Sequence, residues 1–228
     1  MHSEYSHPGP VPWNSRDVWL GLVVFALWII LFLAFQFLSS ALSLDLDQGL
    51  VVSLGELLLL APVWWFTVRK YQVGWEKLGL RGFQGRTISL GCGLMLLSFA
   101  FNFFYSLFLA LFDLRAQVDL VPILAELSSP WLLLVGGAVI APVVEEIFFR
   151  GFVFAGLRQA YGWKRAAVIS SALFALLHLT PAAFMPIFLL GYIFAYLYHR
   201  SDSIWPATLM HVLTNTLALG AAYVLAQA

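Results

Sequence analysis

The stretch Val143-Val-Glu-Glu-Ile-Phe-Phe-Arg-Gly151 lies inside an apolar run that begins near Trp131 and continues past Phe154. It carries two adjacent carboxylates and an arginine, three ionisable groups within six positions. An ionisable side chain at the centre of a membrane costs about 2.5–3.5 kcal/mol on insertion scales, so such groups are rare there and usually functional. Three of them together indicate that this segment holds both a structural pairing and a reactive group.

On a helix the two carboxylates point in different directions, so they can have different roles. Glu146 and Arg150 have the i, i+4 spacing that lets two side chains pair on one face of a helix. Successive side chains point about 100° apart, so Glu145 lies about 140° around the helix from Arg150. We therefore predict a structural ion pair between Glu146 and Arg150, and we predict that Glu145 faces a cavity.

The composition is that of a membrane protein. Of the 228 residues, 61% are hydrophobic and 11% are charged, and the mean hydropathy is +0.88. Soluble domains contain about 25% charged residues. The formal net charge is zero, and no basic stretch suggests a nucleic-acid partner. The composition therefore predicts an all-α fold, a polytopic integral membrane helical bundle.

Seven apolar runs approach the length of about 20 residues that a membrane-spanning helix needs. We expect about seven transmembrane helices in a single domain, residues 18–228. Residues 1–17 have no cleaved-signal pattern, so we interpret them as a cytoplasmic tail. The fifth and sixth runs are short enough to form a tight pair within the protein. The runs cover residues 18–42, 50–68, 88–112, 131–157, 166–179, 184–198 and 205–225.

The loop charges predict the orientation of these helices. Ten of the twelve Lys and Arg residues fall in segments on one side of the membrane, whereas the opposite loops hold only Arg115. Cytoplasmic loops carry an excess of Lys and Arg, so the N-terminus is predicted to be cytoplasmic and the C-terminus external. The ten residues are Arg16, Arg69, Lys70, Lys77, Arg81, Arg86, Arg158, Lys164, Arg165 and Arg200.

Polar side chains also interrupt two later apolar runs. The fifth run ends in His178, and the seventh carries His211 and Asn215 at i, i+4 on one face. Taken singly, a membrane histidine is usually a hydrogen-bonded packing residue, and an asparagine often joins neighbouring helices. Together with Glu145, they make four polar side chains on three helices. Coincidence is a less credible explanation for four such side chains than for one.

The sequence before Glu145 favours an irregular backbone. Pro142 removes a backbone hydrogen bond, and Gly136-Gly137 permits close approach of another helix. Backbone groups in a membrane are left unpaired only where water or protein compensates. We therefore expect a water-filled cavity near Glu145.

Three motifs in this order resemble those of the CPBP family of intramembrane proteases. The family includes the type II CAAX prenyl endopeptidases (the Rce1 group) and bacterial proteins linked to bacteriocin self-immunity. The resemblance covers residues 131–219, which form the predicted protease-like core. The motifs are Glu145-Glu146-x-x-x-Arg150, Phe174-x-x-x-His178 and His211-x-x-x-Asn215.

The resemblance implies an intramembrane endopeptidase and a role for each polar residue. Glu145 and His178 are expected to activate a water, and His211 and Asn215 to form an oxyanion hole. Members of the family are often labelled metalloproteases, and Glu145, His178 and His211 could supply three ligands to a catalytic zinc. The sequence has no His-Glu-x-x-His, and a liganding Glu145 could not serve as the base. We therefore favour metal-free glutamate chemistry and commit to no cofactor.

Two other classes of function stay open, a non-catalytic immunity or scaffold protein and a transporter. The sequence has neither paired broken helices nor an internal repeat, which disfavours transport. The expected partners are membrane lipids and a peptide or protein substrate, with lipidated substrates included. The expected location is a prokaryotic plasma membrane. Glu56, a further carboxylate in the second run, is expected near the external interface or against a neighbouring helix.

Overall fold

The computed structural model describes residues 9–44, 46, 48–115, 120–126 and 130–227. These residues form helices and connecting loops, with no strand among them. Four of the predicted runs are single α-helices over nearly their whole length, and a fifth, α10, is extended at its start by the 3-10 turn η5. The helices are α1 (Ser15–Ala41), α4 (Arg86–Ala110), α9 (Trp163–Leu177), η5 (Pro181–Ala183) with α10 (Phe184–Ser201), and α11 (Trp205–Ala226).

The other two predicted runs are helical but irregular. The second run is interrupted and comprises α2 (Gln48–Leu57), α3 (Leu60–Trp64) and the π-helical η1 (Trp65–Arg69). The fourth comprises α6 (Trp131–Val135), η3 (Gly136–Ile140), α7 (Ala141–Glu146), η4 (Ile147–Phe154) and α8 (Ala155–Tyr161), with η3 and η4 π-helical. Two short elements lie in loops, η2 (Trp75–Leu78) and α5 (Val121–Glu126).

Among the described residues, five helical stretches are long and apolar enough to cross a membrane. The interrupted second run is not one of them. The fifth run is not one of the five stretches either, because α9 has 15 residues and a full span needs about 20. The predicted all-α membrane bundle is confirmed, with five continuous spans and two shorter or broken helical segments. The five spans are Ser15–Ala41, Arg86–Ala110, Trp131–Tyr161, Pro181–Ser201 and Trp205–Ala226.

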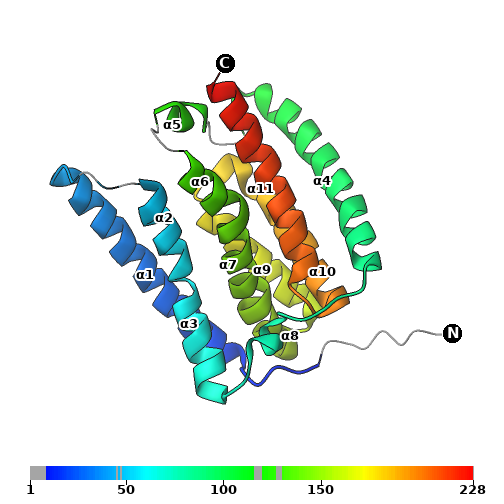
Figure 1. Ribbon diagram of the computed structural model, residues 1–228. Helices are drawn as coiled ribbons and strands as arrows, with labels where there is room; N and C mark the ends of the chain where they lie inside the picture. Colours follow the sequence, from blue (N-terminus) through cyan, green and yellow to red (C-terminus); the bar gives the residue numbers. More distant parts are fainter. Residues whose placement is uncertain (1–8, 45, 47, 116–119, 127–129, 228) are drawn as a thin grey trace.

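The helices lie side by side in one bundle (Figure 1). The α1–α3 segment forms one edge, α4 forms the opposite edge, and the helix that contains α7 runs between them. The α10 helix packs against α9, α4 and α11. Its approach to α9 is close at Gly191, where an added Cβ would lie 3.1 Å from the Cα of Ser171. Small residues at such crossings let helix backbones pack tightly in a membrane.

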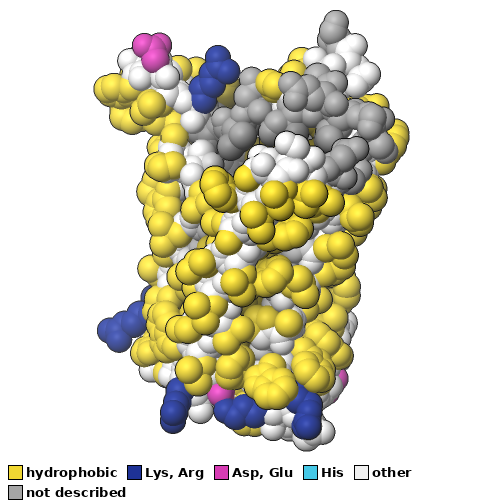
Figure 2. Space-filling model, turned by 90° about the vertical axis from the view of Figure 1, so that its left-hand side faces the viewer, with side chains coloured by type: hydrophobic (Ala, Val, Ile, Leu, Met, Phe, Trp, Pro, Cys, Tyr) yellow, Lys and Arg dark blue, Asp and Glu magenta, His cyan; other side chains and the backbone are white. Residues whose placement is uncertain are grey.

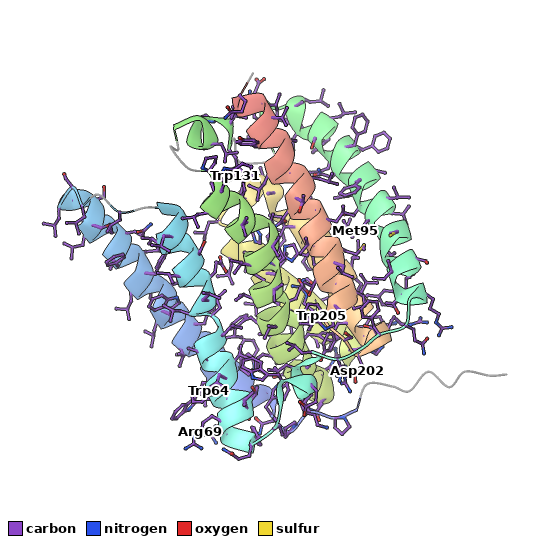
Figure 3. All side chains as sticks on the ribbon, viewed as in Figure 1. Trp64, Arg69, Met95, Trp131, Asp202 and Trp205 are labelled. Atoms are coloured by element: carbon purple, nitrogen blue, oxygen red, sulfur yellow. The ribbon has the colours of Figure 1, made fainter. Side chains whose placement is uncertain are left out.

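The surface has the polarity of a membrane protein. In Figure 2, hydrophobic side chains cover the middle of the face, and most of the Lys and Arg side chains in view lie toward its lower end. Figure 3 places Arg69 and Asp202 toward the same end and Trp131 toward the other. The apolar side chains of α1 are largely exposed, including Leu31 and Phe37. An exposed apolar belt of this kind suits contact with lipid tails.

Polar contacts join the segments at the lower end of the bundle. Asp202 forms ion pairs with Arg81 and, at 3.4 Å, with Arg158. The Ile204 N–H donates to the Gly79 carbonyl at 3.0 Å, which fixes the loop after η2 to the start of α11. These contacts hold together segments that are far apart in the sequence.

A second polar cluster at this end joins α1 to η1. Lys70 pairs with Asp17, and the Tyr71 hydroxyl donates to the same carboxylate at 2.6 Å. The hydrogen bond to Asp17 raises the pKa of Lys70 above its ordinary value. The start of α1 is therefore tied to the end of the interrupted second run.

The residues just before α1 are part of the packed structure. Asn14 caps the helix by accepting from the Asp17 N–H, and the Asp17 side chain accepts from the Asn14 N–H in return. Trp13 is completely buried, and its indole N–H donates to the Phe152 carbonyl at 3.1 Å. This segment thereby anchors α1 to η4.

A close backbone approach between η2 and η4 yields a first prediction. A Cβ added at Gly151 would lie 2.6 Å from the Leu78 carbonyl oxygen, which is backbone and cannot rotate away. We expect Gly151→Ala to lower the melting temperature of the purified protein in detergent, because overpacking typically costs about 1–3 kcal/mol.

The matched control is Gly93→Ala in α4, where nothing lies within 4 Å of the added Cβ. That change should leave the melting temperature unchanged or raise it, because alanine favours a helix over glycine by about 1 kcal/mol. Equal melting of the Gly151→Ala variant and the wild type would contradict the close contact.

Candidate active site

The π-helical segment η3 leaves one backbone carbonyl without a donor from its own helix, and Asn215 binds this carbonyl. In a π-helix, the N–H of residue i bonds to the carbonyl of residue i−5. The Ala141 N–H follows this pattern and donates to the Gly136 carbonyl. The next donor would be Pro142, which has no N–H, so this pattern provides no donor for the Gly137 carbonyl. The Asn215 Nδ2 donates to that oxygen at 2.9 Å and so joins α11 to the helix that carries Glu145.

Side chains from other elements bind the carbonyls of η4 in the same way. The Ser170 hydroxyl on α9 donates to the Phe149 carbonyl at 2.9 Å. The Trp13 indole binds the Phe152 carbonyl, as described above. Short π-helical segments often occur at functional sites. Here two of them flank Glu145, and partners from three parts of the chain fix their backbone.

The Glu146 and Arg150 side chains form an ion pair with 2.9 Å between Oε1 and Nη1, and both are completely buried. The Arg150 Nη2 also donates to the Gly191 carbonyl at 3.1 Å, which joins η4 to α10. Aromatic rings surround the guanidinium carbon, and such cation–π contacts are worth about 2 kcal/mol when desolvated. Their centroids lie 5.7, 4.6 and 5.3 Å away in Phe149, Phe174 and Phe194, respectively.

The His211 ring lies between the two glutamates. Its Nδ1 is 3.1 Å from the Glu146 Oε1, and its Nε2 is 3.6 Å from the Glu145 Oε2. A carboxylate only accepts hydrogen bonds, so the Nδ1 carries a proton and donates to Glu146. The ring also stacks on Phe194 at a centroid distance of 5.0 Å. His211 therefore connects the buried ion pair to Glu145.

A cavity of about 310 Å³ lies beside Glu145. This volume is at the lower end of the range for ligand pockets, about 300–1,000 Å³. Helices α1, α2, α7 and α9 contribute to its wall, together with η4 and Leu59 just before α3. Its ionisable groups are Glu56, Glu145 and His178. The other lining residues are Phe25, Trp28, Ile29, Phe32, Gly55, Leu59, Phe149, Phe174 and Leu177.

Glu145 and His178 each present a polar atom that can accept a hydrogen bond. The Glu145 side chain is 17% exposed. Its Oε2 has no hydrogen-bond partner among the described residues. The His178 Nδ1 lies 2.8 Å from the Phe174 carbonyl, so that nitrogen carries the proton and donates. In the neutral ring, the Nε2 of His178 then keeps a lone pair that can accept a proton.

The structure brings most of the predicted site residues together. Glu145 and His178 line one cavity, and His211 lies next to Glu145. Asn215 does not line that cavity and instead binds the Gly137 carbonyl. Glu56, expected elsewhere, lines the same cavity as Glu145. A sequence signal for this position was the adjacent glycine, Gly55, where an added Cβ would lie 2.9 Å from a ring carbon of Phe32 on α1.

Comparison with known proteins agrees with the motifs. Residues 127–217 match the family model described as type II CAAX prenyl endopeptidase Rce1-like. This matched part, called the Rce1-like segment, covers less than half of the chain and supports the resemblance drawn from the three motifs. It contains Glu145, His178, His211 and Asn215.

One curated relative of this chain is "Putative membrane peptidase YdiL" of Bacillus subtilis (strain 168). It is 28% identical over 105 residues, which cover 46% of this chain and 43% of the relative. The chain thus matches less than half the length of that relative. No solved structure matches. Both sequence comparisons support a membrane protease.

The Rce1-like segment does not assemble the zinc ligands considered above. Among the described residues, no three His, Cys, Asp or Glu side chains are grouped so that they could hold a metal ion. The set of Glu145, His178 and His211 therefore does not fit a three-ligand zinc centre in this arrangement.

The buried ion pair yields a second prediction. Arg150→Ala leaves Glu146 as an unpaired buried charge, and breaking a buried pair costs about 3–5 kcal/mol. We expect much less folded Arg150→Ala protein in the membrane fraction, measured by fluorescence-detected size-exclusion chromatography. Arg165→Ala, which removes an exposed arginine, is the matched control and should accumulate normally. Wild-type amounts of folded Arg150→Ala protein would contradict a structural role for the pair.

Proposed function

We propose that the protein is an intramembrane endopeptidase that hydrolyses a peptide bond with a water activated by Glu145 and His178. The observation that carries this proposal is the cavity that these two residues share. The Glu145 Oε2 has no hydrogen-bond partner among the described residues, which suits an atom that binds the reacting water. The Rce1-like segment supports the same class of reaction.

In the proposed reaction, the water lies between the Glu145 carboxylate and the Nε2 of His178. Glu145 accepts a proton from the water as its oxygen attacks the peptide carbonyl carbon, and the carbonyl oxygen becomes an oxyanion. The C–N bond then breaks, and the proton passes from Glu145 to the leaving nitrogen. The products are a carboxylic acid and an amine, and the carboxylate is restored. A positioned base of this kind typically contributes about 100- to 10,000-fold in rate.

We further propose that His211 and Asn215 stabilise the oxyanion. The Nδ1 proton of His211 is directed at Glu146, so His211 donates to the oxyanion from Nε2 in its imidazolium form. An amide NH₂ group has two donors, so Asn215 can bind the Gly137 carbonyl and still donate once more.

The setting of this reaction is part of the proposal. The substrate is a peptide or protein, and lipidated substrates are included, as the family description suggests. The protein resides in a prokaryotic plasma membrane with its N-terminus in the cytoplasm. The excess of Lys and Arg in the N-terminal and alternate loops supports this orientation.

The function is tested with a Glu145→Gln variant. This change keeps the size of the side chain and removes the base, so we expect normal accumulation and loss of peptide cleavage. Purified protein and a library of peptides analysed by mass spectrometry provide the measurement. Asn215→Ala should lower turnover by about 100- to 1000-fold, the usual effect of removing one oxyanion donor. The matched control is Glu76→Gln on the exposed loop, which should cleave normally.

Two results would contradict the proposal in different ways. Undiminished cleavage or cellular function in Glu145→Gln would favour a non-catalytic immunity or scaffold protein. Activity that disappears on chelation and returns with added zinc would make Glu145, His178 and His211 metal ligands. We expect activity to survive thorough chelation, because the proposed steps use only side chains of this chain.

The orientation is tested with reporters placed at two positions. A reporter inserted within residues 69–86 should lie in the cytoplasm, and one fused after Ala228 should lie outside. The physical reason is the concentration of Lys and Arg in the segment 69–86. Accessibility to a membrane-impermeant reagent in intact cells measures both positions. Labelling in the same compartment would contradict the proposed orientation.

A further inference from the structure

We infer that Glu56 determines substrate specificity by binding a basic side chain, Lys or Arg, of the peptide within the cavity. The inference rests on the proposed endopeptidase function and adds a substrate class to it. Glu56 is outside the three motifs and outside the Rce1-like segment.

The first observation is the placement of Glu56. It lies in the last turn of α2, and it lines the cavity together with Glu145 and His178. Its Oε2 is buried and has no hydrogen-bond partner among the described residues. A buried carboxylate is costly unless it is paired and hydrogen-bonded. The position of Glu56 therefore suits a group that gains its partner when a ligand binds.

The second observation is the charge of the cavity wall. Among the described residues, those that line it include two glutamates and one histidine but no lysine or arginine. Arg150, in the neighbouring motif, is fully buried and bound to Glu146 and the Gly191 carbonyl. The α2 and α9 helices also both end at the cavity, since His178 directly follows α9. The C-terminal ends of helices carry partial negative charge, which favours a cation.

The third observation is the apolar part of the wall. Five aromatic side chains line the cavity, and the faces of such rings attract Lys and Arg side chains. The apolar stems of these side chains can pack along the same rings. The five are Phe25, Trp28, Phe32, Phe149 and Phe174. A carboxylate among aromatic rings thus matches an organic cation on an apolar stem.

An inorganic cation fits this wall less well. Calcium takes about six to eight oxygen ligands, and magnesium needs near-octahedral oxygen geometry. The acidic side chains of the cavity come only from Glu56 and Glu145 among the described lining residues. A basic side chain needs fewer contacts. Its charge at Glu56 would also offset the repulsion between the two carboxylates.

The test compares two sets of peptides with the purified full-length protein. In one set, a single Lys is placed at each position of an otherwise apolar peptide, and in the other set Met replaces that Lys. We expect one position at which the Lys matters: with Lys there, wild-type protein should cleave the peptide with a kcat/KM about 10- to 100-fold higher than the matching Met peptide. That range corresponds to the usual strength of a hydrogen bond to a charged group.

Glu56→Gln should bring the ratio for these two peptides close to one while cleavage of the Met peptide continues. Glu56→Lys should reverse the preference in favour of a peptide with Glu at that position. Glu76→Gln, which removes an exposed carboxylate, should keep the wild-type ratio. If Glu56→Gln fails to accumulate, Glu56→Asp replaces it in the test. The shorter aspartate holds its carboxylate farther from the bound Lys, so the Lys-to-Met ratio should fall but stay above one.

The outcomes separate this inference from the proposed function. Cleavage of Lys and Met peptides at equal rates at every position would overturn the role of Glu56 and leave the endopeptidase in place. A Lys preference that persists in Glu56→Gln would also overturn it. A wild-type protein that cleaves neither set, and no other library peptide, would instead contradict the endopeptidase function.

Discussion

The ion pair between Glu146 and Arg150 is the interaction on which the arrangement of the bundle depends. Removing two charges from water costs several kcal/mol per ion, so a fully buried pair is stable only when further contacts satisfy both groups. Arg150 contacts the Gly191 carbonyl and the rings of Phe174 and Phe194, and Glu146 contacts His211. These contacts come from α9, α10 and α11, although the Glu146 Oε2 and the Arg150 Nε have no hydrogen-bond partner among the described residues. The requirement to satisfy one buried pair therefore brings the three later helices to the motif helix.

The irregular backbone of the motif helix has a similar effect. Carbonyls in its π-helical segments are bound by Asn215 from α11, Ser170 from α9 and Trp13 from the segment before α1. An unbound carbonyl would be costly at this depth, so each bond fixes the position of a neighbouring element. Asn215 shows the consequence for the site. Its bond to the Gly137 carbonyl gives it a structural contact in addition to the catalytic role that we propose.

The sequence predicted what depends on local pattern. Long apolar runs have to become helices in a membrane, and the i, i+4 spacing of Glu146 and Arg150 places them on one face. The sequence did not predict the features that depend on contacts between distant segments. The position of Glu56 follows from the packing of α2 against other helices, and the burial of Trp13 follows from its bond to η4. Pro142 indicated an irregular backbone, but Asn215, which binds the Gly137 carbonyl, lies 78 positions after Gly137 in the chain.

The cavity lies where two helices, α2 and α9, end. With 15 residues, α9 rises about 22 Å, less than the hydrocarbon thickness of about 30 Å, and ends beside His178. The α2 helix also stops early, one residue after Glu56. Helix ends leave backbone carbonyls without intrahelical partners, and membranes tolerate them only against protein or a polar cavity. The interruptions that shorten α9 and α2 therefore bring two helix ends to the wall of the cavity beside Glu145.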